Sequence, residues 1–291
     1  MNTARPPLCL EPGSPSWPAD LDHIDGRPER IWLRGRVELL EKKPRIAVVG
    51  SRSPTPYGEA QARRFAYALA EAGATIVSGL ARGIDSAAHR AALDANGATI
   101  AVLGSGVDRP WPTGPLTDEM HRRALLLSEF QPGESPRPHH FPLRNRLISG
   151  LCLGVIVIEA AHASGSLITA RWAADQGRTV WALPGRVDHP MSRGSHRLIR
   201  EGATLVESPE EIVREILGEA AVRGDARADR GTQLTREEQC ILAVLQGETL
   251  DADAVAARTE IELQTVLATL VALEVADLVV RAPGGLYRRG R

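Results

Sequence analysis

The sequence predicts a doubly wound α/β domain with a mostly parallel sheet, followed by a small winged-helix domain. Hydrophobic residues make up 43% of the 291 residues and charged residues 24%, which is typical of a globular chain. From residue 45, short β-branched runs alternate with helix-length segments, the pattern of a parallel sheet with helices on both faces. After residue 231, three helical patterns are followed by a Gly-Gly turn between two short strands, which is the winged-helix plan.

The predicted strands of the α/β domain are near-continuous apolar runs, as parallel strands buried on both faces require. They cover residues 46–50, 75–79, 98–104, 125–129, 153–159, 179–184 and 203–207. The predicted helices cover 57–72, 85–96 and 167–176, and each is followed by a glycine that can end a helix in a left-handed conformation.

Changes in composition mark the domain boundaries. Residues 1–44 are rich in proline and charge, with one short edge strand expected at 31–35, and are predicted to form an N-terminal extension. The α/β domain is expected over 45–217, a polar linker over 218–231 and the winged-helix domain over 232–291.

Charge and cysteine content exclude several classes of protein. The 35 lysine and arginine residues against 36 acidic residues leave a net charge of −1, so any nucleic-acid site must be local. The only lysines, Lys42 and Lys43, stand in no GxxxxGK[ST] loop, which excludes a P-loop ATPase. The three cysteines form no CxxC pair, so neither a metal site nor a disulfide framework is expected. No apolar run is long enough to span a bilayer, and we expect a cytoplasmic protein without membrane insertion.

The loop after the first strand, GSRSPTPYG at 50–58, has the composition of a phosphate cradle. Gly50 allows a close backbone turn, and the hydroxyls of Ser51 and Thr55 can donate to phosphate oxygens. Arg52 offers a planar fork that matches a phosphate. The alternative is an ordinary strand-to-helix turn with an exposed arginine.

The loop after the second strand, at 78–89, carries Arg82 and, at an expected helix N-cap, Asp85. Backbone N–H groups at such a helix start can bind an anion. His89 lies one turn after Asp85 and invites a catalytic interpretation, but no nucleophile motif accompanies the pair. A capping aspartate and a partly buried histidine are the favoured roles.

Two later strands also end in polar, glycine-containing loops. The fifth strand ends at Glu159 and is followed by Ser164, Gly165 and Ser166, which can form an amide nest for phosphate or cap a helix. The sixth ends at ALPGR, 182–186. Because the carboxyl ends of parallel strands share one edge of the sheet, the four loops predict one working face there.

The most basic stretch of the α/β domain lies between the fourth and fifth strands, at 134–146. Its arginines can neutralise phosphates while Phe141 accepts a splayed base, an arrangement of single-strand binders. An equally weighted alternative makes Phe141 a hydrophobic staple for a helix that begins near Pro142. The candidate side chains of this Pro-rich loop are Arg137, His139, His140, Phe141, Arg144 and Arg146.

The winged-helix domain lacks the charge of a duplex reader. Residues 232–291 contain six arginines against nine acidic residues, and the expected reading helix begins with Glu260 and Glu262. Because duplex binding requires a basic footprint, protein contact or structural packing is favoured for this domain.

Several motifs occur together in an order that resembles the DNA-processing protein A (DprA, or Smf) family. They are GSRSPTPYG, SGLARGIDSAAH, AVLGSGVDRPWP, LLSEFQPG, FPLRNRLISGL, IEAAHASGSLITA, ALPGR and RGSHRLIREGATLV, within about residues 15–207. The resemblance implies an extended Rossmann-like domain that binds single-stranded DNA, forms a homodimer and loads the RecA recombinase in natural transformation. It implies no catalytic residues, no cofactor and no metal.

The resemblance also assigns residues. Positions that match its DNA-holding motifs are Gly50, Ser51, Arg52, Thr55, Phe141, Arg144, Asn145, Arg146, Ser164, Gly165 and Ser166. Arg82, Arg137 and His140 join this predicted DNA-binding set from the basic stretches. The matching self-association surface lies around Leu198, Ile199 and Leu205.

The chain departs from the family pattern at a few places. Only 44 residues precede the α/β domain, so an additional N-terminal helical domain is expected to be absent. Trp111 and Trp17 replace a commoner tyrosine before proline, which should change little, and His196 replaces an asparagine near the expected dimer surface.

Two other functions remain as alternatives. The first is a nucleotide-processing enzyme similar to phosphoribohydrolases, with Glu159 as base, although its PGGxGTxxE-type loop is missing. The second is a transcription regulator that acts through the winged helix, which the charge of that domain opposes.

Overall fold

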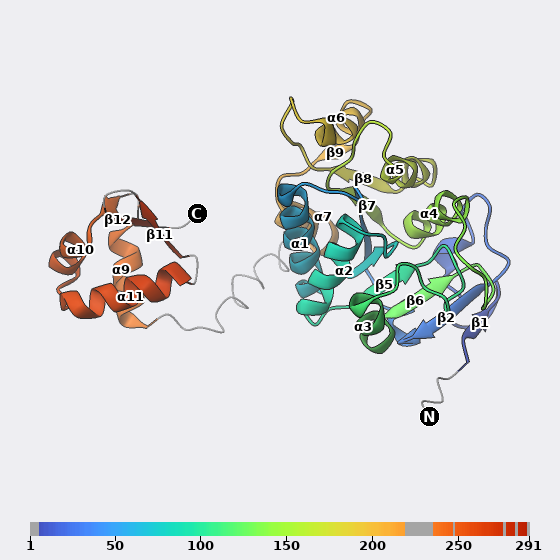
Figure 1. The fold of residues 1–291 in the computed structure, drawn as a ribbon, viewed down its shortest axis with the longest axis horizontal. Coiled ribbons are helices and arrows are strands. Elements are labelled where there is room, and N and C mark those ends of the chain that lie inside the picture. Colours follow the sequence, from blue (N-terminus) through green and yellow to red (C-terminus); the bar gives the residue numbers. More distant parts are fainter. Residues whose placement is uncertain (1–5, 219–234, 247, 276–277, 283–284, 290–291) are drawn as a thin grey trace. The chain divides into compact units, whose positions relative to one another are not determined.

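The computed structural model describes residues 6–218, 235–246, 248–275, 278–282 and 285–289. The chain divides into two compact units, Met1–Gly224 and Asp225–Arg291 (Figure 1). The division falls inside the predicted linker, of which residues 219–231 lie outside the described part. None of the described helices is long and apolar enough to cross a bilayer.

A nine-stranded sheet forms the centre of the first unit, in the order β1-β2-β6-β5-β4-β3-β7-β8-β9. The strands are β1 (Leu8–Leu10), β2 (Ile31–Gly35), β3 (Arg45–Val49), β4 (Thr75–Ser78), β5 (Thr99–Val102), β6 (Leu125–Ser128), β7 (Gly154–Val157), β8 (Thr179–Ala182) and β9 (Thr204–Leu205). All neighbours from β6 to β9 in this order pair in parallel, and β1 and β2 add antiparallel strands at one edge. Every residue of β3 to β7 is buried, which confirms the predicted mostly parallel, doubly wound sheet.

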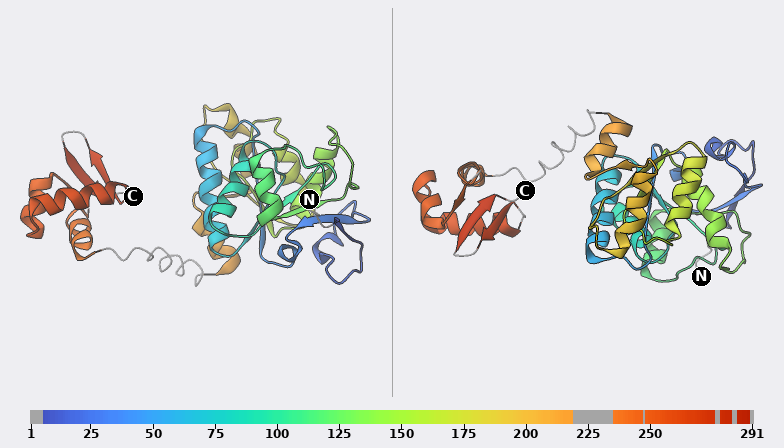
Figure 2. Two further views of the ribbon diagram at one scale, coloured as in Figure 1. Left: turned by 60° about the horizontal axis from the view of Figure 1, so that its bottom comes forward. Right: turned by 90° about the horizontal axis from the view of Figure 1, so that it is seen from above.

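Helices cover both faces of the sheet (Figure 2). They are α1 (Pro56–Glu71), α2 (Ile84–Asp94), α3 (Pro115–Arg123), α4 (His140–Gly150), α5 (Ser166–Asp175), α6 (Arg193–Arg200) and α7 (Pro209–Leu217), with short 3-10 turns at Ala19–Leu21, Val37–Leu40 and Pro190–Ser192. One apolar cluster joins α1, α2 and α7 to one face around Phe65, and another joins α4 and α5 to the opposite face around Leu147. The helices predicted at 57–72, 85–96 and 167–176 are α1, α2 and α5.

Two local predictions are wrong. The basic stretch is not a loop up to Pro142, because α4 begins at His140 and places Phe141, Arg144 and Arg146 on a helix. Asp85 is not the N-cap of α2, a position taken by Gly83; its carboxylate instead accepts hydrogen bonds from the backbone of the preceding loop.

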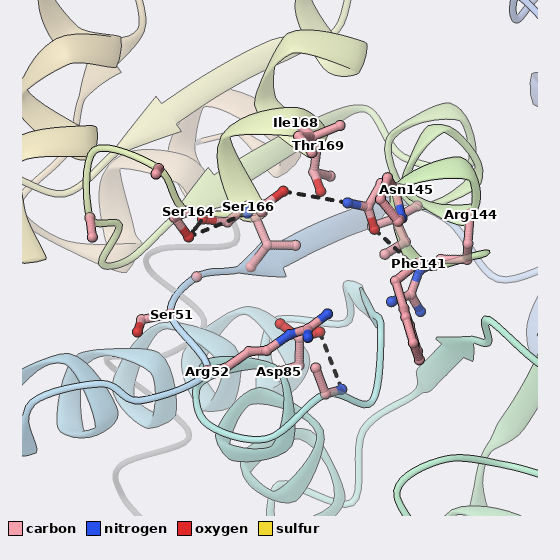
Figure 3. A pocket seen from close by; sticks show the side chains of 18 of the residues that line it. Ser51, Arg52, Asp85, Phe141, Arg144, Asn145, Ser164, Ser166, Ile168 and Thr169 are labelled. Carbon is pink, nitrogen blue, oxygen red and sulfur yellow. Dashed lines mark hydrogen bonds between the residues drawn. The ribbon is translucent and has the colours of Figure 1, made fainter. Parts of the chain in front are cut away.

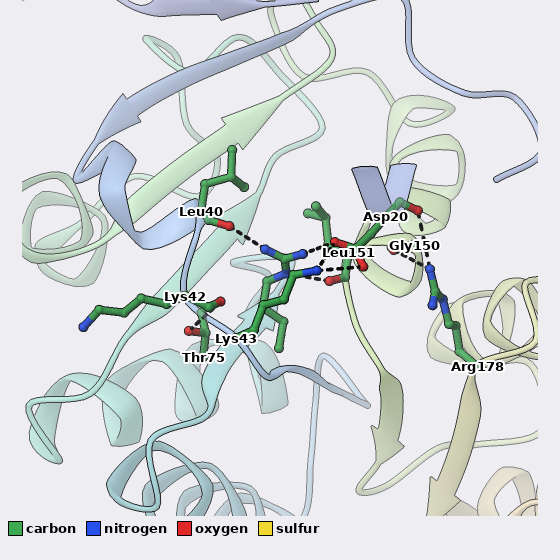
Figure 4. Close-up of polar contacts among 9 residues, drawn as sticks. Asp20, Leu40, Lys42, Lys43, Thr75, Gly150, Leu151 and Arg178 are labelled. Carbon is green, nitrogen blue, oxygen red and sulfur yellow. Dashed lines mark hydrogen bonds and ion pairs between the residues drawn. The ribbon is translucent and has the colours of Figure 1, made fainter. Parts of the chain in front are cut away.

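Residues 6–44 belong to the α/β unit and do not form a separate extension. The strand predicted at 31–35 is β2, but it is not an edge strand, because β1 pairs outside it. Buried Arg45, the first residue of β3, forms an ion pair with Asp20 and donates to the carbonyl of Leu151 at 2.6 Å. Arg178 donates to the carbonyl of Asp20 at 3.4 Å, as Figure 4 shows. These contacts tie the N-terminal segment to the core.

The charges around Asp20 explain why a partly buried carboxylate is stable there. Burial opposes its ionisation, but a hydrogen bond from Lys43 and the charges of Arg45, Lys43 and Arg178 hold the pKa of Asp20 below its usual value. A composition change at residue 44 is therefore not a structural boundary.

The second unit has its own apolar core around Ile241, Leu270 and Tyr287. It contains α9 (Arg236–Val244), β10 (Thr249–Leu250), α10 (Ala252–Thr259), α11 (Leu263–Val275), β11 (Val279–Ala282) and β12 (Leu286–Arg289). The three strands form a small sheet in the order β10-β12-β11. Three helices with a terminal hairpin confirm the predicted winged-helix domain.

Candidate functional site

A cavity of about 700 Å³, called here the central pocket, opens at the carboxyl ends of β3 and β7 (Figure 3). Going outward from β3, the chain builds β4, β5 and β6 on one side and β7, β8 and β9 on the other. The pocket therefore lies where the strand order reverses, the usual ligand position in open α/β sheets. It is lined by residues within 49–53, 81–85, 138–148 and 161–169. The predicted loop at 182–186 does not line it.

The turn after β3 presents Arg52 to the pocket. The Ser51 amide donates to the carbonyl of Glu159 at 2.8 Å, and the Ser51 hydroxyl accepts from the Ser53 amide at 3.0 Å, which closes the turn. A Cβ at Gly50 would lie 2.7 Å from Ile84, so only glycine fits there. Arg52 itself is exposed and pairs with no carboxylate among the described residues.

Thr55, predicted to contact phosphate, serves α1 instead. Its hydroxyl donates to Glu159 Oε1 at 2.7 Å and accepts from the Gly58 amide at 3.1 Å, while its amide donates to Glu159 Oε2 at 2.8 Å. Thr55 is thus the N-cap of the helix and does not line the pocket. Glu159 holds the turn with both carboxylate oxygens and does not line the pocket, which favours a structural role over that of the base in the enzyme alternative.

Phe141 and Asn145 face the pocket from α4. The Phe141 ring lies so close to Gly104 that a Cβ there would be 2.9 Å from the ring. Arg52 extends toward this ring, with its guanidinium carbon 5.4 Å from the ring centroid (Figure 3). The Asn145 amide donates to the carbonyl of Gly165 at 3.4 Å and so links α4 to the loop before α5.

Arg144 lines the pocket from α4 but is itself buried. Only 3% of it is exposed, and its guanidinium donates to the carbonyls of Gly79 and Val102. A Cβ at Gly79 would lie 2.5 Å from Arg144 Nη2, so glycine is required for this contact. Burial lowers the pKa of Arg144 to about 10, although the charge of Asp85 opposes this, and burial raises the pKa of Asp85 despite Arg144. Both residues line the pocket, so the pair forms a buried charged layer in its floor.

Two other predicted DNA contacts also face away. Arg146 forms a bidentate ion pair with Glu129 and donates to the carbonyl of Gly26 at 2.9 Å, and it does not line the pocket. His140 is buried, with its ring stacked on Phe130 at 3.9 Å. Arg137 is exposed but does not line the pocket. Arg146 and His140 are therefore structural residues.

The predicted serine-glycine-serine nest does line the pocket. The hydroxyls of Ser164 and Ser166 are 2.7 Å apart, and the Ser166 amide donates to Ser164 Oγ at 3.4 Å. Gly165 is exposed between them, at the start of α5. The segment places hydroxyls and helix N-terminal amides opposite Arg52, an arrangement suited to a phosphate.

The pocket is also lined by residues that the motifs do not predict, namely Ser53, Pro138, Ile168 and Thr169. Ile168 and Thr169 lie in the first turn of α5, directly after the nest, and the exposure of Ile168 gives the pocket an apolar wall. Their position directly after a predicted ligand loop is the feature of the sequence that could have predicted them as lining residues.

Below this site, His89 makes the stability of the fold depend on pH. The Thr99 hydroxyl donates to the Ile76 carbonyl at 2.8 Å, so its oxygen accepts from His89 Nδ1 at 2.7 Å. Burial, with the charge of Arg144, lowers the pKa of His89 to about 3. Since the unfolded chain takes up this proton near pH ~6.5, stability is complete above that pH and falls as pH drops toward 3, by up to about 1.4 kcal/mol per pH unit.

Urea unfolding between pH 7 and pH 5 would measure this dependence. We expect His89→Gln to have a shallower pH dependence than the wild type, and exposed His162→Gln to keep the wild-type dependence. A wild-type free energy of unfolding that stays constant or rises as pH falls would contradict the prediction.

Comparisons with known proteins agree with this geometry. The family model described as "DNA recombination-mediator protein A" matches residues 9–217. The chain belongs to the DNA recombination-mediator protein A family. A second model of this family, "DprA winged helix domain", matches residues 225–285. The resemblance inferred from the motifs is therefore confirmed.

Relatives in this family are similar to most of the chain. Protein Smf of Escherichia coli is 40% identical over 283 residues, which covers 94% of this chain and 75% of that protein. The crystal structure of DprA from Streptococcus pneumoniae has a TM-score of 0.70 and 43% identity, covering 73% of this chain and 75% of that one. DprA from Helicobacter pylori has a TM-score of 0.66 and 30% identity, covering 72% of this chain and 94% of that one, and its structure is described as revealing a single-stranded DNA binding mode.

Proposed function

We propose that this protein binds single-stranded DNA in the central pocket. The observation that carries the proposal is the guanidinium of Arg52, exposed and without a carboxylate partner among the described residues, over the ring of Phe141. A base can stack on the ring while its phosphate binds Arg52 and the nest at Ser164–Ser166. The description of the Helicobacter pylori relative as a single-stranded DNA binder supports the same ligand.

We expect only a few phosphate contacts to contribute to the affinity for single-stranded DNA. The chain as a whole has a net charge of −1, so bulk charge does not attract a polynucleotide. The buried charges of Arg144 and Asp85 oppose each other in the pocket lining, which leaves Arg52 as the main exposed cation there. We therefore propose that recognition depends on stacking together with one or two phosphate contacts.

The same proposal includes delivery of the bound strand to RecA in natural transformation, by a cytoplasmic homodimer. The dimer would use the region around Leu198, Ile199 and Leu205. Leu205 is 44% exposed on β9, a two-residue strand at the end of the nine-stranded order. An open strand edge with an exposed leucine favours pairing with a second copy.

We propose binding without catalysis. The hydrolase alternative needs a free carboxylate in the pocket. Both carboxylate oxygens of Glu159 accept hydrogen bonds from Thr55, and Asp85 accepts one from the Gly79 amide at 3.1 Å. For the winged-helix unit we propose protein contact. Its α11 contains no lysine or arginine, and it exposes Leu267 and Val271.

A comparison of single-stranded and duplex oligonucleotides of one sequence, titrated across salt concentrations, tests the proposal. We expect the single strand to bind more tightly, because only unpaired bases can stack on Phe141, with an affinity that falls as salt rises. Equal affinity for the two forms, or no binding to either, would refute it. Release of free base from nucleoside monophosphates would favour the hydrolase instead.

A further inference from the structure

Two grooves continue from the central pocket along the same face. The first, the Trp111 groove, has a volume of about 400 Å³ and is bordered by Arg52, Arg82, Trp111 and Phe141. It shares Arg52 and Phe141 with the central pocket. The second, the α3 groove, has a volume of about 560 Å³ and shares Arg52 and Arg82 with the Trp111 groove. The three hollows thus form one continuous path.

This path is basic along its length. Four arginines and one carboxylate, that of Glu59, line the α3 groove. Arg63 and Arg90 there are engaged by Glu59 and Glu119, each at 3.4 Å. Arg82, like Arg52, is exposed and forms no ion pair with any carboxylate in the described part of the chain. The two arginines without carboxylate partners therefore flank the Trp111 groove, where phosphates would find them available.

Trp111 is the exposed aromatic ring between these arginines. It is 51% exposed, whereas Trp17 and Trp181 are buried and Trp32 and Trp172 are intermediate. The loop that carries it is anchored on both sides. The Ser105 hydroxyl donates to the Arg109 carbonyl at 2.7 Å, and the Thr117 hydroxyl donates to the Pro112 carbonyl at 2.6 Å. An exposed ring on an anchored loop is a prearranged stacking surface.

We propose that Trp111 is a second base-stacking position, so that an unpaired strand leaves Phe141, crosses Trp111 and enters the α3 groove. Arg52 and Arg82 bind the phosphates on either side of the second base. This inference rests on the proposed function and extends it, since it sets the path of the strand and the minimum length that reaches full affinity. Because every base has a stackable face, the position is tolerant of sequence.

Oligothymidylates of two lengths separate this position from the central pocket. We expect one of about three nucleotides to bind wild type and Trp111→Ala equally, because it occupies the central pocket alone. One of about nine nucleotides should bind Trp111→Ala roughly tenfold more weakly than wild type. Trp111→Phe should restore most of the affinity, and Tyr67→Ala, which removes an exposed ring outside all three hollows, should change nothing.

Tryptophan fluorescence gives an independent measurement. The longer oligonucleotide should protect the exposed Trp111 from iodide quenching, and the shorter should not. Arg82→Ala should lower the salt dependence of binding, as the slope of log K against log salt, by about 0.7 for the longer strand only.

The outcomes distinguish this inference from the proposed function. If wild-type protein binds neither length, the proposed function fails and the inference fails with it. If wild type binds but Trp111→Ala matches it at both lengths, only the inference is overturned. Equal weakening at both lengths also overturns it, because Trp111 would then act on the central pocket.

Discussion

Replacing Arg144 with alanine will destabilise the α/β unit by about 3–5 kcal/mol, the range observed when one partner of a buried charged pair is removed. The substitution leaves the carbonyls of Gly79 and Val102 without their donor. It also leaves Asp85 buried without the opposing charge of the guanidinium. Thermal or urea unfolding, followed by circular dichroism, would measure the loss.

Arg52→Ala is the matched control for this experiment. It also removes an arginine from the pocket, but an exposed one, and should leave the unfolding transition within about 0.5 kcal/mol of wild type. An Arg144→Ala protein with wild-type stability would contradict the structural role of Arg144.

Arg52 and Phe141 should account for most of the affinity for single-stranded DNA. Arg52→Ala removes a charge-assisted phosphate contact, so we expect roughly tenfold weaker binding and a salt slope smaller by about 0.7. Phe141→Ala removes a stacking surface worth about 1–3 kcal/mol per base, with little change in salt slope. Because the guanidinium lies on the ring, at 5.4 Å, the two losses should not add in the double variant.

Fluorescence anisotropy with one labelled oligonucleotide across salt concentrations would measure the affinity of the wild type, the two single variants and the double variant. Arg122→Ala, which removes an exposed arginine of α3 outside the pocket, is the control and should bind as wild type does. Wild-type affinity in the double variant at matched salt would remove Arg52 and Phe141 from the site.

Most of the α/β unit could be predicted because its local signals agree. The buried run at 46–50 covers β3 except for its first residue, and the run at 153–159 contains β7. The helix predicted at 57–72 matches α1 to within one residue at each end. The predicted extension differs from the structure because residues 6–44 are held in the α/β unit by partners far away in the sequence. Arg45 and Arg178 hold Asp20 in place across long sequence separations, which no local pattern reveals.

The sequence predicts which residue types form the candidate site better than it predicts which of their side chains point into the pocket. Once α4 is known to begin at His140, its period of 3.6 residues places Phe141, Asn145 and Ile148 on the pocket side and Arg146 on another. The proline-rich composition of the basic stretch predicts a loop, which has no such period. Trp111, expected to matter little, borders a groove only because its loop is anchored beside Arg82.

Residue order was enough to establish a parallel α/β sheet, a winged-helix unit, the family and the loops that carry glycine, serine and arginine, since these depend on short-range patterns of burial and turn chemistry. Strand order and side-chain direction depended on packing between segments far apart in the chain. Placing β3 between β4 and β7 is what makes the loops meet in one pocket, and it is burial against Gly79 that turns Arg144 from a surface cation into part of the core.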